Sequence, residues 1–252
     1  MLKPCFADLH VHTVLSPCGE VEMIPPLIVQ QARRIGLSII AVTDHNSAEN
    51  AAAVMEAAEG SGITVLPGME VQTREEAHLV CLFDDLEQVY CWQETVYDHL
   101  PDEENLENVF GPQFVVDAAG RFIRRNKRLL VTSTSLSAEQ IVEGVTHQGG
   151  LCIAAHIDRP TFGLLSVLGF IPPGLDLAAV EISSRLSPDE AYRRFPQLVG
   201  RPVIVSGDAH RLSELVARTL LVVEKPSVAE LRLAFEGSCG RSSKVVLETD
   251  RS

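Results

Sequence analysis

Short apolar segments rich in Val, Ile and Leu recur along the chain, and helix-like stretches separate many of them. The apolar segments lie at residues 5–9, 37–42, 63–66, 78–83, 151–155, 178–182, 202–205 and 219–223. Segments that are apolar on both faces are typical of buried strands in a parallel sheet. The helix-like stretches lie at residues 25–35, 47–59, 138–148, 188–198, 211–217 and 227–236. The expected N-cap residues are Ser47, Ser137, Ser187 and Ser227. The alternation predicts an α/β fold, and closure of its sheet into a barrel is one form that this fold takes.

The length of 252 residues suits a single domain, because α/β barrels of this size routinely form one folding unit. Residues 84–135 break the alternation and are expected to be an insertion. Residues 84–117 carry ten acidic residues and no Lys or Arg, and a basic cluster follows at residues 121–128. We expect a β-hairpin at residues 113–123 and a frayed tail at residues 241–252.

The chain is acidic, with 34 Asp and Glu against 21 Lys and Arg and a net charge of −13. A field of that sign repels the phosphates of a long nucleic acid, which is therefore not an expected partner. A small phosphorylated substrate stays compatible, because bound cations reverse the local field. No apolar run is long enough to cross a bilayer, and the six cysteines include no C-x-x-C pair. These features favour a cytoplasmic protein without a membrane partner or a disulfide framework, and they leave the oligomeric state open.

Histidines and carboxylates stand at the points where several predicted strands end. His10 and His12 are two residues apart, so strand periodicity points both side chains to the same side. For such a pair alone, capping of a strand is as reasonable as metal binding. Further residues at or just after strand ends are His45, Glu70, His156, Asp208 and His210. Because the carboxyl ends of barrel strands meet at one mouth, these side chains predict one metal centre, and their donor types favour zinc, manganese or iron. His78 instead opens its segment and is the weaker member on position alone.

The motifs around these residues resemble, in order, those of the PHP family, named for polymerases and histidinol phosphatases. They read Asp-Leu-His-Val-His-Thr, Thr-Asp-His, Pro-Gly-Met-Glu, Ala-His-Leu-Val, Ala-Ala-His and Ser-Gly-Asp-Ala-His. The match covers roughly residues 6–215. The resemblance implies a distorted (β/α)7 TIM-like barrel of the PHP type with a trinuclear metal centre and phosphoesterase activity.

The resemblance also implies roles for single residues, and with them two or three divalent ions. The ligands implied for the first ion are His10, His12, Glu70 and Asp208. Glu70 would bridge to a second ion held by His78 and His156. A third ion would be held by His45 and His210.

The chain departs from the family pattern at the third ion. Family members often carry an Asp or His ligand after the first strand, whereas this chain reads Ser-Pro-Cys-Gly-Glu at residues 16–20. Pro17 cannot ligate a metal. Either Cys18 or Glu20 takes the missing place, which would change the softness of the site, or the third site is weak or empty.

Other polar residues near the motifs have two interpretations each. Arg159, three residues after His156, is placed to bind a substrate phosphate from the rim; the alternative is a surface ion pair with Asp158. Asp44 is expected either to orient a ligand or to cap a helix. His147 is expected to stabilise a helix end.

Three functional hypotheses follow from these residues. The first is a metal-dependent phosphohydrolase that cleaves a phosphate ester of a small metabolite or nucleotide by a metal-activated hydroxide. The second is an exonuclease-like phosphodiesterase, which the basic cluster at residues 121–128 keeps open. The third is a non-catalytic, metal-stabilised binding module, which the loss of a ligand at Pro17 favours.

Overall fold

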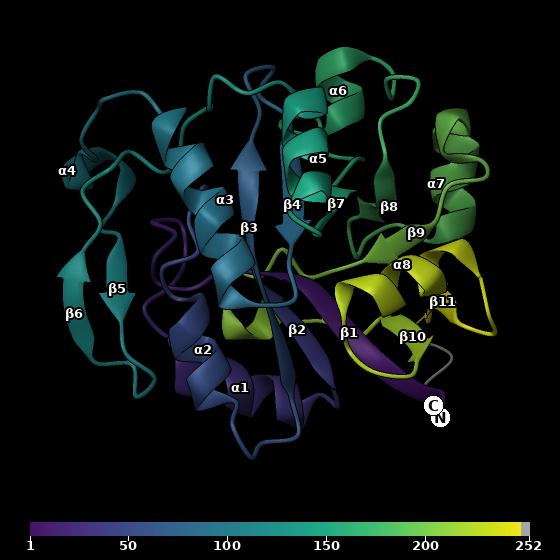
Figure 1. Cartoon of the computed structure of the whole chain (residues 1–252), viewed down its shortest axis with the longest axis horizontal. Helices are drawn as coiled ribbons and strands as arrows, with labels where there is room; N and C mark the ends of the chain where they lie inside the picture. The colour runs from purple at the N-terminus through teal and green to yellow at the C-terminus, as the bar shows by residue number, and fades with distance from the viewer. Residues whose placement is uncertain (248–252) are drawn as a thin grey trace.

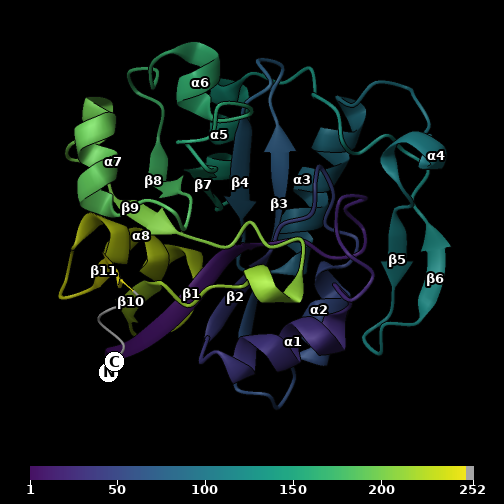
Figure 2. The same cartoon turned by 180° about the vertical axis from the view of Figure 1, so that it is seen from behind.

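Seven strands are hydrogen-bonded side by side in the computed structural model, which describes residues 1–247 (Figure 1, Figure 2). In spatial order they are β1 (Lys3–Val11), β2 (Ile39–Val42), β3 (Thr64–Gln72), β4 (His78–Leu82), β7 (Leu151–Ala154), β8 (Leu177–Ile182) and β9 (Val203–Val205). Most of their residues are buried, as strands covered on both faces must be.

The sheet nearly closes because the chain after β9 returns to β1. Ala209 pairs with Val11 in a parallel bridge, and the backbone nitrogen of His12 donates to the oxygen of Ala209 at 3.0 Å. Two further strands, β10 (Thr219–Val223) and β11 (Ser242–Val245), extend the first half of β1 as an antiparallel ribbon. The predicted distorted (β/α)7 barrel is thereby confirmed.

One strand departs from the parallel arrangement that its apolar sequence favours, because β4 runs antiparallel to both of its neighbours, β3 and β7. The connection from β3 is a tight turn, in which the nitrogen of Thr73 donates to the oxygen of Ala77 at 2.8 Å. So short a connection cannot carry a crossover, and only an antiparallel return is possible. His78 at the start of β4 is therefore paired with Gln72 at the end of β3.

Helices cover the outside of the sheet. The main ones are α1 (Pro25–Arg34), α2 (Ala51–Ala57), α3 (Leu86–Asp98), α5 (Ala138–His147), α6 (Leu164–Leu168), α7 (Pro188–Arg194) and α8 (Val228–Glu236). The predicted caps Ser137, Ser187 and Ser227 each accept a hydrogen bond from a backbone nitrogen of the first turn. Ser47 is not a cap, because its hydroxyl is bonded to Gln93 and Tyr97 and the helix begins only at Ala51.

The helix expected at residues 211–217 is also wrong. In place of that helix the structure has a single 3-10 turn, η2 (Leu212–Glu214). Another 3-10 turn, η1 (Pro196–Leu198), lies elsewhere in the chain, after α7. The nitrogen of Val216 donates to the buried carboxylate of Asp8 at 2.9 Å, which holds the chain out of a helical path.

Residues 84–135 contain α3, a short α4 (Glu107–Phe110) and a hairpin of β5 (Phe114–Val116) and β6 (Phe122–Arg125). The hairpin confirms the prediction for residues 113–123, and Figure 1 shows it beside the barrel with α4. Val89, Trp92 and Val96 of α3 belong to the main apolar core, so this helix packs as part of the barrel. That the chain is a single domain in which residues 84–135 are an insertion stays a prediction.

The tail expected at residues 241–252 is wrong where the structure describes it, since Ser242–Val245 pairs with β10. Residues 248–252 lie outside the described part. None of the helices in the described part of the chain has the length and apolar character needed to span a membrane.

Candidate metal centre

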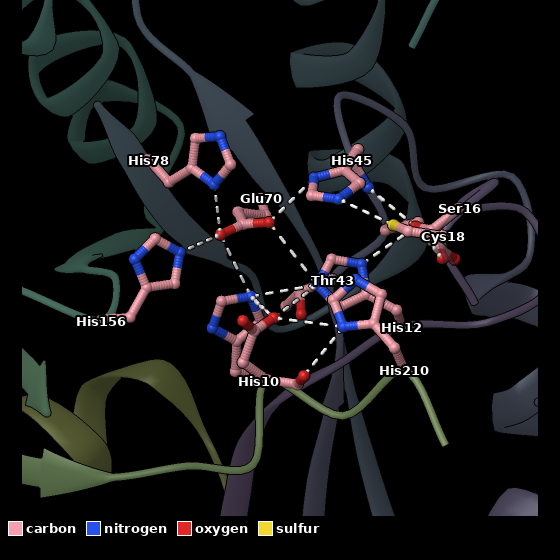
Figure 3. Close-up of polar contacts among 12 residues, drawn as sticks. His10, His12, Ser16, Cys18, Thr43, His45, Glu70, His78, His156 and His210 are labelled. Carbon is pink, nitrogen blue, oxygen red and sulfur yellow. Dashed lines mark hydrogen bonds and ion pairs between the residues drawn. The ribbon is translucent and has the colours of Figure 1, made fainter. Parts of the chain in front are cut away.

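The structure gathers all eight predicted ligands at one end of the barrel (Figure 3). They are His10, His12, His45, Glu70, His78, His156, Asp208 and His210. His78 belongs there because β4 is antiparallel, so the start of β4 lies beside the carboxyl ends of β3 and β7. Their roles as ligands stay predictions, but their convergence is a property of the fold.

Four of these side chains bring one ligand atom each within 4.8 Å of one another: His10, His12, Glu70 and Asp208. The Nε2 atom of His10 lies 3.3 Å from both Glu70 Oε1 and Asp208 Oδ1. The Nε2 atom of His12 lies 3.1 Å from Asp208 Oδ1. This is the set that the resemblance implies for a first ion.

Glu70 lies at the middle of the cluster and uses its two oxygens in different directions (Figure 3). Its Oε1 lies 2.8 Å from His78 Nδ1 and 3.1 Å from His156 Nε2. Its Oε2 lies 2.9 Å from His45 Nδ1 on the other side. A carboxylate in this position is suited to bridge two cations.

The donor set fits a cation on its own geometry. Glu70 Oε2 is buried and accepts no hydrogen bond of regular geometry from the described residues, although His45 Nδ1 is close. The Nε2 atoms of His10 and His12 face each other at 3.1 Å, and at most one of them can donate to the other. Lone pairs turned inward on one buried point are what a divalent ion requires.

The ionisation states of the two carboxylates also favour the binding of a cation. Burial opposes the ionisation of Glu70, but His78, His10 and His45 outweigh it and hold the pKa of Glu70 well below its usual value. Burial likewise opposes the ionisation of Asp208, yet His10 and His12 keep the pKa of Asp208 well below its usual value. Burial, with His210 and His45 beside it, lowers the pKa of His12 far below normal. The centre therefore presents anionic carboxylates and at least one neutral imidazole.

In the loop after β1, the side chain of Cys18 faces the cluster and that of Glu20 does not. The Sγ atom of Cys18 lies 3.3 Å from His45 Nε2. His45 belongs with His12 and His210 to one group whose ring nitrogens lie within 4.8 Å of one another. Glu20 turns away and pairs with Arg211 at 3.1 Å. Removal of the thiol from water would raise its pKa, but its bonds to His210 and His45 lower the pKa of Cys18 to about 6.

Asp44 orients this loop and does not cap a helix. Its Oδ1 accepts hydrogen bonds from the nitrogen of Thr13 and from Ser16 Oγ, both at 2.7 Å. The Oγ atom of Ser16 in turn lies 2.9 Å from His12 Nδ1. Asp44 thus acts on the cluster through Ser16 and His12.

Two buried carboxylates next to the ligands were missed by the sequence analysis. Glu181 Oε1 lies 3.1 Å from both His10 Nδ1 and the backbone nitrogen of His156. Asp8 accepts the nitrogens of Gly207 and Val216 at 2.9 Å, and burial raises the pKa of Asp8 to about 7. A signal existed for Glu181, because it is a charged residue near the end of the otherwise apolar β8.

Strained backbone occurs at two ligands. His156 has a φ of 26° and Asp208 a φ of 45°, although neither is glycine. Such conformations cost about 1–3 kcal/mol each and persist where the surroundings impose them, which is common at functional sites. The bonds of Glu181 to His156 and of Gly207 to Asp8 are part of those surroundings.

Arg159 pairs with Asp208, a predicted metal ligand, and not with Asp158. Asp158 is instead bonded to the nitrogen and hydroxyl of Ser183, at 2.8 and 2.7 Å. The alternative of a surface pair between Arg159 and Asp158 is therefore wrong. With its side chain 44% exposed, Arg159 reaches both the cluster and the solvent. His147 lies exposed in the last turn of α5, as expected.

A Glu181→Gln variant tests how His10 is held. The carboxylate accepts the proton of His10 Nδ1 and so directs the lone pair of Nε2 towards the cluster. We expect metal affinity to fall about 10- to 100-fold, measured by titration against a metal buffer. The matched control is Glu143→Gln on the exposed face of α5. Equal affinities of the two variants would refute the role of Glu181.

The chain is similar in sequence or in fold to known proteins. A model of the PHP domain matches residues 8–163. The uncharacterized protein MJ1587 of Methanocaldococcus jannaschii is 24% identical over 184 residues, which are 70% of this chain and 80% of that protein. The lesion-specific endonuclease PfuEndoQ of Pyrococcus furiosus is 19% identical with a TM-score of 0.71, covering 96% of this chain and 58% of that one.

A fourth comparison concerns a chain of similar length. The crystal structure of a putative metal-dependent phosphoesterase from Bifidobacterium adolescentis is 20% identical with a TM-score of 0.55, covering 88% of this chain and 89% of that one. At these identities the two structures show a shared fold. The chain spans 58% of the length of the endonuclease, so the activity of that whole protein is not transferred by the fold.

Proposed function

Because this chain belongs to the PHP domain family of metal-dependent phosphoesterases, we propose that it is a hydrolase that cleaves the phosphate ester of a small metabolite or nucleotide. The observation that carries the proposal is the position of Glu70. One buried carboxylate has its two oxygens within 3.1 Å of nitrogens of His45, His78 and His156, with His10 and His12 next to it. This arrangement favours two or more divalent ions.

The residues of the chain prepare this site in three ways. Glu181 fixes the ring of His10, and Ser16, held by Asp44, fixes the ring of His12. Arg159 offers a planar cation at the rim, where it would bind a phosphate oxygen. When bound, divalent ions supply Lewis-acid activation of water and neutralise the charge of the phosphoryl group.

The role of Arg159 is tested with Arg159→Ala. A charge-assisted hydrogen bond to phosphate is worth about 1.5–3 kcal/mol, so we expect KM for phosphate esters to rise by about 10- to 100-fold. Steady-state kinetics on a phosphate monoester measure the effect. Arg185→Ala, in the exposed loop after β8, is the matched control. Wild-type KM and kcat in the Arg159 variant would remove this residue from the site.

A nuclease activity is the second candidate, because the fold of PfuEndoQ matches over 96% of this chain. The basic cluster at residues 121–128 gives it weak support, since several of its charges are already paired. Arg121, Arg124 and Arg125 lie 2.7, 3.0 and 3.0 Å from Asp117, Glu49 and Glu107. These pairs reduce the positive field that a long phosphate backbone requires.

One assay separates the candidates. The metal-loaded protein is incubated with a panel of phosphate monoesters and, in parallel, with labelled single-stranded DNA and a duplex that contains a damaged base. We expect turnover of monoesters and intact DNA. Cleavage of DNA without monoester turnover would replace the proposal with the nuclease. Bound metal with no turnover of any ester would favour the binding module.

A further inference from the structure

The loop at residues 16–20 places a sulfur atom where the chain departs from the motif of its family. Its turn is fixed by hydrogen bonds from the nitrogens of Ser16 to Thr13 and of Gly19 to Ser16, at 3.1 and 2.8 Å. The nitrogen of Glu20 donates to the oxygen of His210 at 2.8 Å and joins the loop to the segment after β9. Cys18, between these anchors, is held with its Sγ atom 3.3 Å from Nε2 of His45 (Figure 3). His45 and His210 belong, with His12, to one group whose ring nitrogens lie within 4.8 Å of one another.

In both histidines, His45 and His210, the Nδ1 atom lies next to an oxygen atom. His210 Nδ1 lies 2.9 Å from the backbone oxygen of Asp208, which only accepts, so the proton of this ring belongs on Nδ1. His45 Nδ1 lies 2.9 Å from Glu70 Oε2, next to the lone pairs of that carboxylate. In His210 the lone pair is thereby left on Nε2. In His45 the Nε2 atom faces the sulfur of Cys18 at 3.3 Å.

We propose that Cys18, His45 and His210 form a zinc site with one thiolate ligand, which supplies the third ion of this centre. Three protein ligands and an open fourth position are the usual composition of a catalytic zinc site. The inference rests on the proposed function, because the site shares Glu70 and Asp208 as neighbours with the other ions. It deepens that function by assigning the metal of the third site and one ligand, Cys18, that the family pattern does not supply.

The donor atoms distinguish this site from the rest of the centre. Its ligands are sulfur and imidazole nitrogen, whereas His10, His12, Glu70 and Asp208 offer two carboxylates with two imidazoles. A soft thiolate selects zinc over manganese, and carboxylates accept either. We therefore expect a mixed centre in which excess manganese exchanges at the carboxylate sites and leaves zinc at Cys18.

Cobalt substitution tests the sulfur ligand directly. The metal-stripped protein is reconstituted with Co²⁺, and the near-ultraviolet charge-transfer absorption of a cobalt thiolate is recorded. We expect the band in the wild type and in the control Cys91→Ser, whose cysteine is exposed on α3. Cys18→Ser is expected to lose the band and to bind one ion fewer by elemental analysis, while the remaining ions stay.

Several outcomes would overturn the inference. A wild type that binds cobalt and hydrolyses esters without the band would refute the thiolate ligand and leave the proposed function intact. A Cys18→Ser variant that keeps the band would do the same. A wild-type protein that binds no metal would contradict both the zinc site and the proposed function.

A second measurement needs no variant. Metal should protect Cys18 of the wild type from alkylation by at least about tenfold, since a bound thiolate is no longer a free nucleophile. Mass spectrometry resolves Cys18 from the exposed Cys91 and Cys239, whose labelling should not depend on metal. Equal labelling of Cys18 with and without metal would refute the site even if the variant fails to fold.

Discussion

A Glu70→Gln variant is expected to lose hydrolytic activity by about 10³-fold, because Glu70 would bridge two ions and the loss of its charge would cost several kcal/mol in the transition state. Both oxygens of Glu70 are in contact with ring nitrogens, and the residue is 1% exposed. Glutamine keeps the shape but removes the charge, and its amide hydrogens point at histidines that should hold a cation. The variant should therefore also retain fewer ions.

The experiment pairs kinetics on a phosphate monoester with elemental analysis of the same samples. Glu59→Gln is the matched control, since Glu59 is exposed in the turn after α2. We expect the control to keep the activity and the metal content of the wild type. A Glu70→Gln variant with wild-type kcat and metal content would show that the centre of the cluster is not where the chemistry takes place.

A Trp92→Ala variant is expected to lose about 3–5 kcal/mol of unfolding free energy. Trp92 is 2% exposed and belongs to the same apolar cluster as Val89 and Val142. Its ring packs so tightly on Gly144 of α5 that even a Cβ atom at Gly144 would lie 2.5 Å from it. Removal of the indole would leave a cavity between α3 and α5 that the rigid sheet cannot fill.

Urea unfolding followed by circular dichroism measures this loss. Cys91→Ala is the matched control on the same helix, where an exposed side chain should change stability by less than about 0.5 kcal/mol. The wild type should unfold in one cooperative transition, as a single domain that includes α3. A loss below about 1 kcal/mol for Trp92→Ala would mean that α3 is a peripheral part of the segment at residues 84–135.

The sequence was sufficient to predict most of the barrel and the gathering of the ligands. Strands that are buried on both faces appear in the sequence as continuous apolar runs. Side chains at the carboxyl ends of barrel strands lie close together for any loop conformation. The pairs His10 with His12 and Asp208 with His210 were therefore predictable from position. Their partners across the site follow from the same rule once the strands are placed.

What escaped prediction depends on contacts between distant segments. The direction of β4 follows from the length of one turn, and it moves His78 from an unfavourable position into the cluster. The side chain of Ser47 resembles a cap in sequence but is bonded to Gln93 and Tyr97 of α3, which are 46 and 50 residues away. Glu181 supports His10 across 171 residues of sequence, and no local pattern encodes such a partner.

The sequence also could not predict which of Cys18 and Glu20 faces the cluster, although the two residues are close together in the chain. Both residues belong to one short loop, and each has a donor atom suited to a metal. Only the ion pair of Glu20 with Arg211 and the contact of Cys18 with His45 separate them. A sequence pattern fixes which residues are available to a site, and the fold decides which of them face it.

The most direct test of a metal-dependent hydrolytic centre is a chelation and reconstitution experiment on the wild-type protein. Its metal content is measured by elemental analysis, the metal is removed with a chelator, and hydrolysis of a phosphate monoester is recorded before, after and upon addition of Zn²⁺ or Mn²⁺. We expect at least two ions per chain, loss of hydrolysis on chelation and its recovery with metal. Hydrolysis that survives complete removal of the metal, or a protein that binds no divalent ion, would contradict this expectation.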